Sequence, residues 1–349
     1  MRYELRGIVL RFGGVTLLLA CAALGQNAPG TQNFPLTDAT GLIARNVNVK
    51  AVEYKGRKAV LVTNTPNRPE GFALLPGTDF QDGTIEADIA VKTTVPPGIR
   101  DPGFIGIAFR ARPDASHYDL FYVRPGNSQA QDQAMRNHST QYVSMPGYDW
   151  FNLRRQWPFI YESYAPMQPE AWTHLRIEVK GREAKLYVNG SEDPSLLVNG
   201  LKGEDLHGGV GLWGNPGEEA YFSNVRITNA TPEPIKNGSD PAGIWQLKFS
   251  GDAGGLQGVL KLARDNNKLS GTWSAGGNES PVQGTWRDGY IEATFPTSWQ
   301  NEPSPVTARL AGWVDGDSAQ GRMIVEGESD GPWTATKGSN SNSLPISAH

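Results

Sequence analysis

The chain has 349 residues, which is more than one hydrophobic core usually supports, so two domains are expected. Its 41 glycines and 25 prolines, with only 19% charged residues, favour strands and turns over helices. The formal net charge is −4 and the chain has no basic stripe, which excludes a typical nucleic-acid-binding protein.

Residues 1–25 have the pattern of an export signal peptide. Arg2, Arg6 and Arg11 form a positive region, residues 15–20 form an apolar run, and Ala23-Leu24-Gly25 forms a cleavage site of mostly small residues. The apolar run is shorter than a membrane span, so no membrane span is expected. This pattern predicts a secreted or periplasmic protein.

Cys21, the single cysteine, leaves an alternative location open. It ends the run Leu18-Leu19-Ala20-Cys21, which resembles a bacterial lipoprotein box except for the Leu before the Ala. Lipidation of Cys21 would tether the protein to a membrane, whereas ordinary cleavage would release it. In both cases the mature fold has no intrachain disulfide and no thiol catalysis.

Period-two alternation predicts an all-β sandwich over residues 30–228, clearest in the run Thr84-Ile85-Glu86-Ala87-Asp88-Ile89-Ala90-Val91. No segment shows a helical period over three turns. The strands expected in this region are 47–52, 59–63, 84–91, 104–110, 118–124, 141–144, 173–179, 185–188, 210–213 and 221–227.

A Pro-rich stretch at 229–242 is expected to be a linker, followed by a small β-barrel at 243–337 and a disordered Ser/Asn-rich tail at 338–349. Hairpin-sized connections favour an up-and-down barrel, because closure removes exposed strand edges. Its tryptophans are expected to pack in the interior or at the rim, and such a tight barrel is filled by side chains. The strands expected here are 245–249, 256–263, 268–274, 282–286, 290–295, 306–314, 319–326 and 332–337.

Residues 118–164 are rich in aromatic side chains mixed with arginines and amides. Disordered segments are poor in aromatic residues, so this block is expected to form an ordered, ligand-facing surface. Flat rings and planar hydrogen-bond donors suit the faces and hydroxyls of sugars. The alternative is that several of these rings only plug the rim of the sandwich.

Strand alternation predicts which side chains face outward. If Ile105, Ile107 and Phe109 face the core, Arg110 points to the opposite face, where Tyr122 and Arg124 are also expected. We therefore predict an open, concave surface carrying these three residues. The alternative is that the arginines pair with Glu86 or Asp88 on a solvated sheet.

Seven segments of the stretch 82–227 carry a resemblance to known domains: residues 82–89, 103–110, 137–142, 161–164, 172–173, 184–190 and 221–227. Through them the stretch resembles concanavalin A-like lectin/glucanase (laminin-G-like) domains, and its arrangement is similar to the 3-keto-disaccharide hydrolase family. It implies a jelly-roll sandwich that serves lectins, hydrolases and adhesive modules alike. The C-terminal part is similar to small lipocalin-like barrels, through Gly243-Ile244-Trp245.

The ligand-binding candidates are the outward residues of the predicted sandwich strands, together with polar and aromatic residues of the aromatic-rich insertion, residues 118–164. They are Arg110, Tyr122, Arg124, Asn137, His138, Gln141, Tyr142, Tyr164, Trp172 and Trp213.

Glycosidic hydrolysis normally needs two carboxylates. Glu86 and Asp88 share a strand face, but Ala90 stands where concanavalin-like glucanases have a third carboxylate, so this strand is not expected to be catalytic. Glu162, among aromatic residues, is the candidate acid or base. The alternative for Glu162 is an ion pair with Arg154 or Arg155.

No cofactor is expected, since the histidines lack metal-ligand spacing and no phosphate-binding loop is present. The resemblance still allows a structural calcium ion, with Asp79, Asp82 and Asn224 as candidate ligands.

The sequence therefore favours an exported carbohydrate-binding protein. Two alternatives remain open: a glycoside hydrolase-type enzyme resembling the 3-keto-disaccharide hydrolases, and a surface adhesion or scaffold protein.

Overall fold

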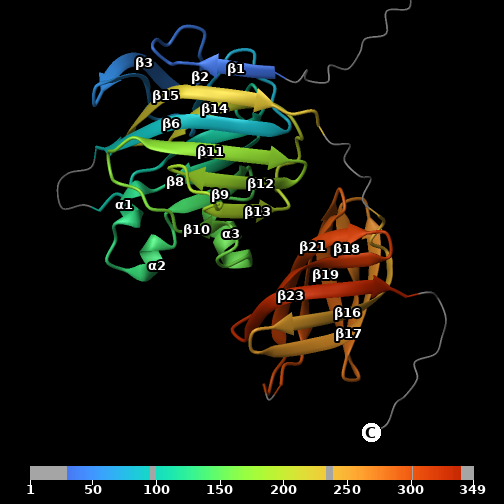
Figure 1. Cartoon of the computed structure of the whole chain (residues 1–349). Helices are drawn as coiled ribbons and strands as arrows, with labels where there is room; N and C mark the ends of the chain where they lie inside the picture. The colour runs from blue at the N-terminus through green and yellow to red at the C-terminus, as the bar shows by residue number, and fades with distance from the viewer. Residues whose placement is uncertain (1–29, 95–99, 233–238, 301, 339–349) are drawn as a thin grey trace, which may run out of the picture.

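The computed structural model describes residues 30–94, 100–232, 239–300 and 302–338. The expected signal peptide with Cys21, residues 233–238 of the expected linker and the tail from 339 lie outside the described residues. Two β-rich parts make up the rest, a sandwich followed by a barrel (Figure 1). The all-β fold class expected from the sequence is confirmed.

The first sheet of the sandwich contains eight strands and is antiparallel. Their order is β13 (Leu196–Asn199), β12 (Glu183–Val188), β11 (Thr173–Lys180), β6 (Gly83–Thr93), β15 (Glu218–Asn229), β4 (Arg57–Asn64) and β3 (Val47–Tyr54), and β1 (Gly30–Phe34) also pairs with β15.

The second sheet contains seven strands and carries the aromatic insertion. Their order is β10 (Glu162–Ser163), β9 (Thr140–Met145), β8 (Tyr118–Val123), β7 (Ile105–Ala111), β14 (Gly209–Gly214), β5 (Phe72–Leu74) and β2 (Ile43–Arg45).

The core lies between the two sheets and follows the alternation of the sequence. Ile85, Ala87 and Ile89 of β6 are at most 1% exposed, while Glu86 and Asp88 between them are half-buried on the outer face. Ile107 and Phe121 supply the facing layer from the second sheet and are fully buried.

Three short helices lie in the insertion, and the sequence reasoning missed them. They are α1 (Pro125–Ser128), α2 (Gln133–Arg136) and α3 (Trp150–Gln156). None spans three turns, so no helical period can develop. Asp149 starts α3 by accepting hydrogen bonds from the backbone N–H groups of Phe151 and Asn152 at 2.8 and 2.9 Å. None of the described helices has the length and apolar character needed to cross a membrane.

The C-terminal part is a closed up-and-down barrel, as expected. Its strands pair in chain order: β16 (Gly243–Gly251), β17 (Gly254–Asp265), β18 (Lys268–Ala275), β19 (Asn278–Arg287), β20 (Tyr290–Thr297), β21 (Val306–Asp315), β22 (Ser318–Val325) and β23 (Ser329–Lys337). Trp245, Trp273 and Trp333 are at most 2% exposed and fill the interior. Trp286 and Trp313 lie half-buried elsewhere on the barrel.

The barrel contacts the sandwich through buried charges. The Lys202 side chain is 1% exposed and forms an ion pair with Glu292 of β20. Its ammonium also lies 5.2–5.7 Å from the ring centres of Tyr148, Trp157 and Tyr161. Burial lowers the pKa of Lys202, and Glu292 opposes that shift. The barrel therefore supplies the anion that this lysine needs.

Glu292→Ala is expected to lower the free energy of unfolding by about 3–5 kcal/mol, because it leaves the Lys202 charge buried without an anion. Chemical denaturation followed by tryptophan fluorescence would measure this loss. The control is Glu326→Ala, since Glu326 is 57% exposed and lies 3.7 Å from Arg309. Its loss is expected to stay within about 1 kcal/mol. Equal losses for both variants would contradict the prediction.

Candidate functional site

A row of cross-strand partners crosses the outer face of the second sheet. Glu162 of β10 pairs with Gln141 of β9, which pairs with Tyr122 of β8; Gly106 of β7 follows, and then Trp213 of β14. Direct cross-strand partners share one face of a sheet. We call Glu162, Gln141, Tyr122 and Trp213 the polar row.

Gly106 permits close packing at the middle of this row. A Cβ atom there would lie 2.7 Å from both Cα and Cβ of Tyr122, which is too close for any side chain. The rings of Tyr122 and Trp213 therefore approach to 5.3 Å between centroids on either side of Gly106. Both are nearly buried, at 4% and 3% exposed.

Arg124 holds the row in place. Its guanidinium donates to the Tyr122 hydroxyl and the Gln141 side-chain oxygen at 2.9 Å each, and to the carbonyl of His138 at 2.6 Å. The outward side shared by Tyr122 and Arg124 is the one predicted from alternation. However, Arg124 is only 5% exposed, so the surface is less open than expected.

Glu162 ends the row as a tightly held carboxylate. Arg154 of α3 donates to both of its oxygens, at 2.8 and 2.6 Å, so the ion pair named as the alternative for Glu162 is present. Nδ1 of His138 lies 2.8 Å from Oε2 of Glu162, outside the alignment of a hydrogen bond. Burial lowers the pKa of His138 despite this carboxylate, which favours a neutral imidazole at neutral pH.

Helix α3 brings exposed rings to the edge of the row. Trp150 and Phe151 are 46% and 56% exposed, whereas Leu153 is fully buried and fixes the helix to the core. The Arg154 guanidinium lies 4.9 Å from the Trp150 ring centre, so one arginine connects the ring to Glu162. The sequence reasoning named neither Trp150 nor Phe151 as a site residue. The capping Asp149 is the signal that could have identified their helix.

Two buried donors at this site have no hydrogen-bond partner among the described residues: Nε of Arg124 and Nε1 of Trp213. The carboxyl of the exposed Glu70 lies near the Trp213 N–H, outside hydrogen-bond geometry. Buried polar atoms are almost always hydrogen-bonded in folded proteins. Unmatched atoms on one face therefore indicate a place where water or a polar ligand binds.

The expected outward orientation of Arg110 is wrong. Strand β7 carries one extra residue between Ala108 and Ala111, and Arg110 adopts a left-handed backbone with φ of 50°. This bulge turns the side chain toward the other sheet, where it donates to the carbonyls of Gln81 and Gly181 and pairs with Asp82. The side chain is 1% exposed, so Arg110 is absent from the predicted surface.

Two other candidates also lie away from the polar row. Tyr142 is fully buried between the sheets, on the opposite face from Gln141, and donates to Asp119 at 2.6 Å. Trp172 lies on the outer face of the first sheet, 4.8 Å from the Arg57 guanidinium and edge-on to Tyr54. The structure therefore does not bring these two residues together with Tyr122.

The remaining candidates lie in the insertion. Asn137 caps the C-terminus of α2 and accepts a hydrogen bond from Gln133 at 2.9 Å. Tyr164 is 44% exposed and follows Glu162 by two residues. Both keep accessible surface near the row.

The carboxylates of the first sheet have partners of their own. Glu86 pairs with Arg226, and Asp88 pairs with Arg57 at 2.7 Å and with His174 at 2.9 Å. The alternative in which Arg110 and Arg124 pair with Glu86 or Asp88 is therefore wrong.

The candidate calcium ligands are engaged separately. Asp79 contacts His207, Asp82 contacts Arg110, and Asn224 donates to Asp88. Within the described ranges no three His, Cys, Asp or Glu residues are placed to hold a metal ion.

No protein-family model matches the chain, and no curated protein sequence matches it. Among solved structures it is similar to carbohydrate-binding module CBM66 from Bacillus subtilis, with 18% identity over 54% of this chain and 96% of that one, and a TM-score of 0.36. It is also similar to a protein of unknown function with a galectin-like fold from Bacillus subtilis, with 10% identity, coverage of 59% and 99%, and a TM-score of 0.39. A third is domain 4 of AbnA, an extracellular arabinanase from Geobacillus stearothermophilus in complex with arabinotriose, with 15% identity, coverage of 54% and 78%, and a TM-score of 0.32. Likenesses this distant assign no activity.

A carboxyl pair beside the row provides a pH test. Glu218 accepts a hydrogen bond from the backbone N–H of Phe104 at 3.2 Å, and the Phe104 ring lies 6.1 Å from that of Tyr122. Burial, followed by the nearby Asp101, raises the pKa of Glu218 from its ordinary 4.5 to about 8. Below pH 4.5 Glu218 is neutral in both the folded and the unfolded chain. Between pH 4.5 and about 8 the Glu218 carboxyl ionises only in the unfolded chain, so its contribution to the free energy of unfolding falls as pH rises.

The free energy of unfolding of the wild type minus that of Glu218→Gln is therefore expected to fall between pH 5 and 8, by up to roughly 1.4 kcal/mol per pH unit. Denaturant titrations at several pH values would measure it. Glu219→Gln is the control, because hydrogen bonding to Tyr221 lowers the pKa of Glu219 and places its effect below this window. A flat difference for Glu218→Gln would contradict the assignment.

Proposed function

We propose that this protein is an exported carbohydrate-binding protein that holds a glycan along the polar row and the exposed rings of α3. The unpartnered donors of Arg124 and Trp213 on one face are the observation that carries this proposal. They would donate hydrogen bonds to sugar hydroxyl oxygens, while the oxygens of Glu162 and Tyr122 accept from sugar hydroxyls.

Trp150 supplies the second element of sugar recognition. A flat, half-exposed ring stacks on the apolar face of a sugar ring, and the neighbouring Arg154 offers planar donors to its hydroxyls. A ligand would therefore contact α3 first and reach toward Tyr122 from the Glu162 end of the row.

Export is part of the proposal, with a lipid anchor at Cys21 as the alternative to release. The resemblance to lipocalin-like barrels is a further proposal, and an enzyme resembling the 3-keto-disaccharide hydrolases is the alternative function. Hydrolysis through Glu162 would need this residue to exchange a proton. The bidentate Arg154 pair instead fixes Glu162 as an acceptor, which favours binding over turnover.

Trp150→Ala is expected to weaken glycan binding roughly two- to ten-fold, since stacking of a ring contributes about 0.5–1.5 kcal/mol. A glycan array with wild-type protein identifies the bound sugar, and titration calorimetry with that sugar measures the loss. Trp286→Ala is a matched control, because Trp286 on the barrel also packs against an arginine, with Arg264 at 4.3 Å. Equal losses in both variants, or an array without any bound glycan, would contradict the proposal.

Glu162→Gln separates binding from catalysis. Gln keeps one acceptor oxygen, so the variant is expected to bind the glycan more weakly. That result, with no product released by the wild type, supports a binding protein. Product release by the wild type that Glu162→Gln abolishes, with binding retained, would establish the hydrolase alternative. Chromatography of oligosaccharides after prolonged incubation makes this measurement.

A further inference from the structure

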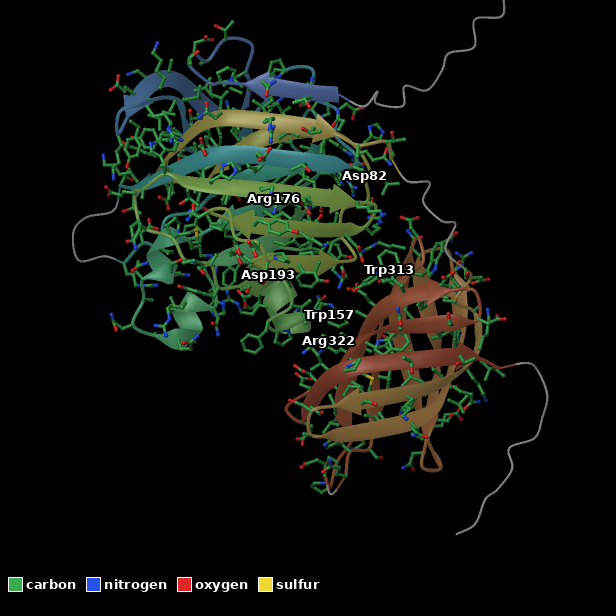
Figure 2. All side chains as sticks on the ribbon, in the orientation of Figure 1. Asp82, Trp157, Arg176, Asp193, Trp313 and Arg322 are labelled. Atoms are coloured by element: carbon green, nitrogen blue, oxygen red, sulfur yellow. The ribbon has the colours of Figure 1, made fainter. Side chains whose placement is uncertain are left out.

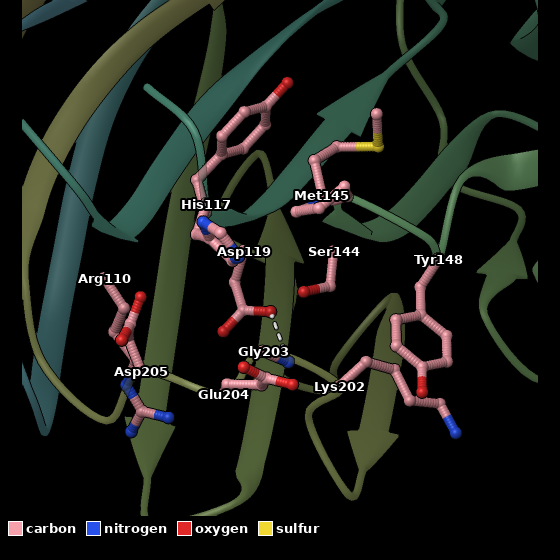
Figure 3. Close-up of a pocket in the computed structure, with 12 residues that line it drawn as sticks. Arg110, His117, Asp119, Ser144, Met145, Tyr148, Lys202, Gly203, Glu204 and Asp205 are labelled. Atoms are coloured by element: carbon pink, nitrogen blue, oxygen red, sulfur yellow. Dashed lines mark hydrogen bonds between the residues drawn. The ribbon is translucent and has the colours of Figure 1, made fainter. Parts of the chain in front are cut away.

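A polar cavity lies at the other end of β8 and β9 from the polar row, on the side where the sandwich approaches the barrel. It has a volume of about 90 Å³ and is lined by Arg110, Asp119, Ser144, Tyr148 and Gly203, among others (Figure 3). On this measure a water needs about 10–15 Å³, so the space corresponds to roughly six waters. That is comparable with the six heavy atoms of a three-carbon polyol.

Asp119 presents one carboxylate oxygen that the protein leaves unmatched. Its Oδ1 accepts from the Tyr142 hydroxyl at 2.6 Å and from the backbone N–H of Gly203 at 3.2 Å. Its Oδ2 is buried and has no partner, although the residue is only 1% exposed. A Cβ atom on residue 203 would lie 2.6 Å from Oδ2, so glycine keeps the space in front of this oxygen clear.

Arg110 presents a matching donor. Its Nε and Nη2 are used by the Gln81 and Gly181 carbonyls and by Asp82, whereas Nη1 is buried without a partner. The bulge in β7 places this guanidinium at the cavity. An unmatched acceptor and an unmatched donor therefore line the same small space.

The charges of the cavity favour a neutral ligand. Asp119 and Arg110 have opposite charges, so a simple anion or cation attracted by one is repelled by the other. Of the other charged residues in the lining, Lys202 pairs with Glu292, Asp205 pairs with Arg112, and Glu204 is exposed to solvent. Burial raises the pKa of Asp119, against the effect of Arg110. A hydroxyl can donate to an ionised carboxylate or accept from a protonated one, so a polyol matches either state, whereas an amino-acid zwitterion needs the ionised form.

The junction between the domains contains a larger groove, which is a weaker candidate. Trp157, Trp313 and Arg322 lie there (Figure 2). Arg322 already pairs with Asp330 at 2.6 Å, and the groove offers no unmatched buried donor or acceptor among the atoms described. Nothing there indicates the chemistry of an occupant.

We propose that the Asp119–Arg110 cavity binds a neutral vicinal diol, either a small polyol or the end of a sugar ring, independently of the polar row. One hydroxyl bonds Oδ2 of Asp119, and the neighbouring hydroxyl oxygen accepts from Nη1 of Arg110. The hydroxyls of Ser144 and Tyr148 line the remaining wall.

Saturation-transfer NMR titrations with glycerol, D-glucose and glycine test this. Wild-type protein is expected to give a saturable signal with glycerol or D-glucose and none with glycine. Asp119→Asn is expected to weaken that binding at least ten-fold, because Asn keeps the Oδ1 acceptor for Tyr142 and Gly203 but replaces Oδ2 with a donor facing Arg110. Trp286→Ala, a barrel substitution outside both proposed sites, is expected to leave glycerol binding unchanged.

Ser144→Ala is the second variant, used if Asp119→Asn does not fold, and is expected to weaken polyol binding several-fold. Three outcomes would overturn the proposal. The first is the absence of a saturable signal from glycerol or glucose up to 100 mM, and the second is preferential binding of glycine. The third is polyol binding that stays unchanged in Asp119→Asn or, if that variant does not fold, in Ser144→Ala. The first outcome would mean that the cavity holds water alone, without bearing on the glycan proposal.

Discussion

The buried Lys202 ammonium is the constraint on which the arrangement of the two domains depends. Three sandwich rings surround it, but its anion, Glu292, comes from the barrel. A charge buried without an anion is costly, so the barrel has to present Glu292 at this point. The neighbouring Gly200 adds a steric condition, since a Cβ there would lie 2.1 Å from the Tyr290 ring. A short segment of the sandwich, residues 200–203, therefore fixes part of the docking contact, together with the Arg182–Asp288 ion pair at 2.7 Å.

The same segment also connects the interface to the sandwich interior. The backbone N–H of Lys202 donates to the Tyr142 hydroxyl at 2.7 Å, and Tyr142 in turn donates to Asp119. The backbone N–H of Gly203 donates to the same carboxylate. This chain of hydrogen bonds runs from the interface to the cavity. Loss of the barrel contact is therefore expected to disturb the Asp119 cavity more than the polar row.

Most strands could be predicted from the sequence because alternation is a local property. Each expected strand of the sandwich overlaps a strand of the structure, and all eight barrel strands follow from alternation and hairpin-sized turns. The short strands β1, β2, β5, β10 and β13 were missed, since two to five residues give little periodicity. Arg110 shows a different limit. One inserted residue shifts the parity of a strand, and no alternation pattern reveals a bulge that depends on pairing with β14.

The candidate site was predictable only in part. Tyr122 and Arg124 share a face because β8 has no bulge up to its last residue, Val123, and Arg124 follows directly, so the alternation of the sequence predicts it. The position of Glu162 beside Gln141 depends on a two-residue strand whose register is set by distant contacts. The exposure of Trp150 depends on a helix of seven residues that a single capping aspartate begins. Both features are non-local or too short for periodicity.

The pleat explains how one pair of strands can serve two sites. Gln141 and Tyr142 are consecutive, yet Gln141 belongs to the polar row and Tyr142 to the Asp119 network between the sheets. On β8, Tyr122 and Asp119 face opposite sides and are three residues apart, which corresponds to about 10 Å along the strand. Substitutions more than about 7–10 Å apart without shared partners usually act independently. Strand geometry alone therefore makes a glycan face and an enclosed polar cavity separable by mutation within a single sandwich.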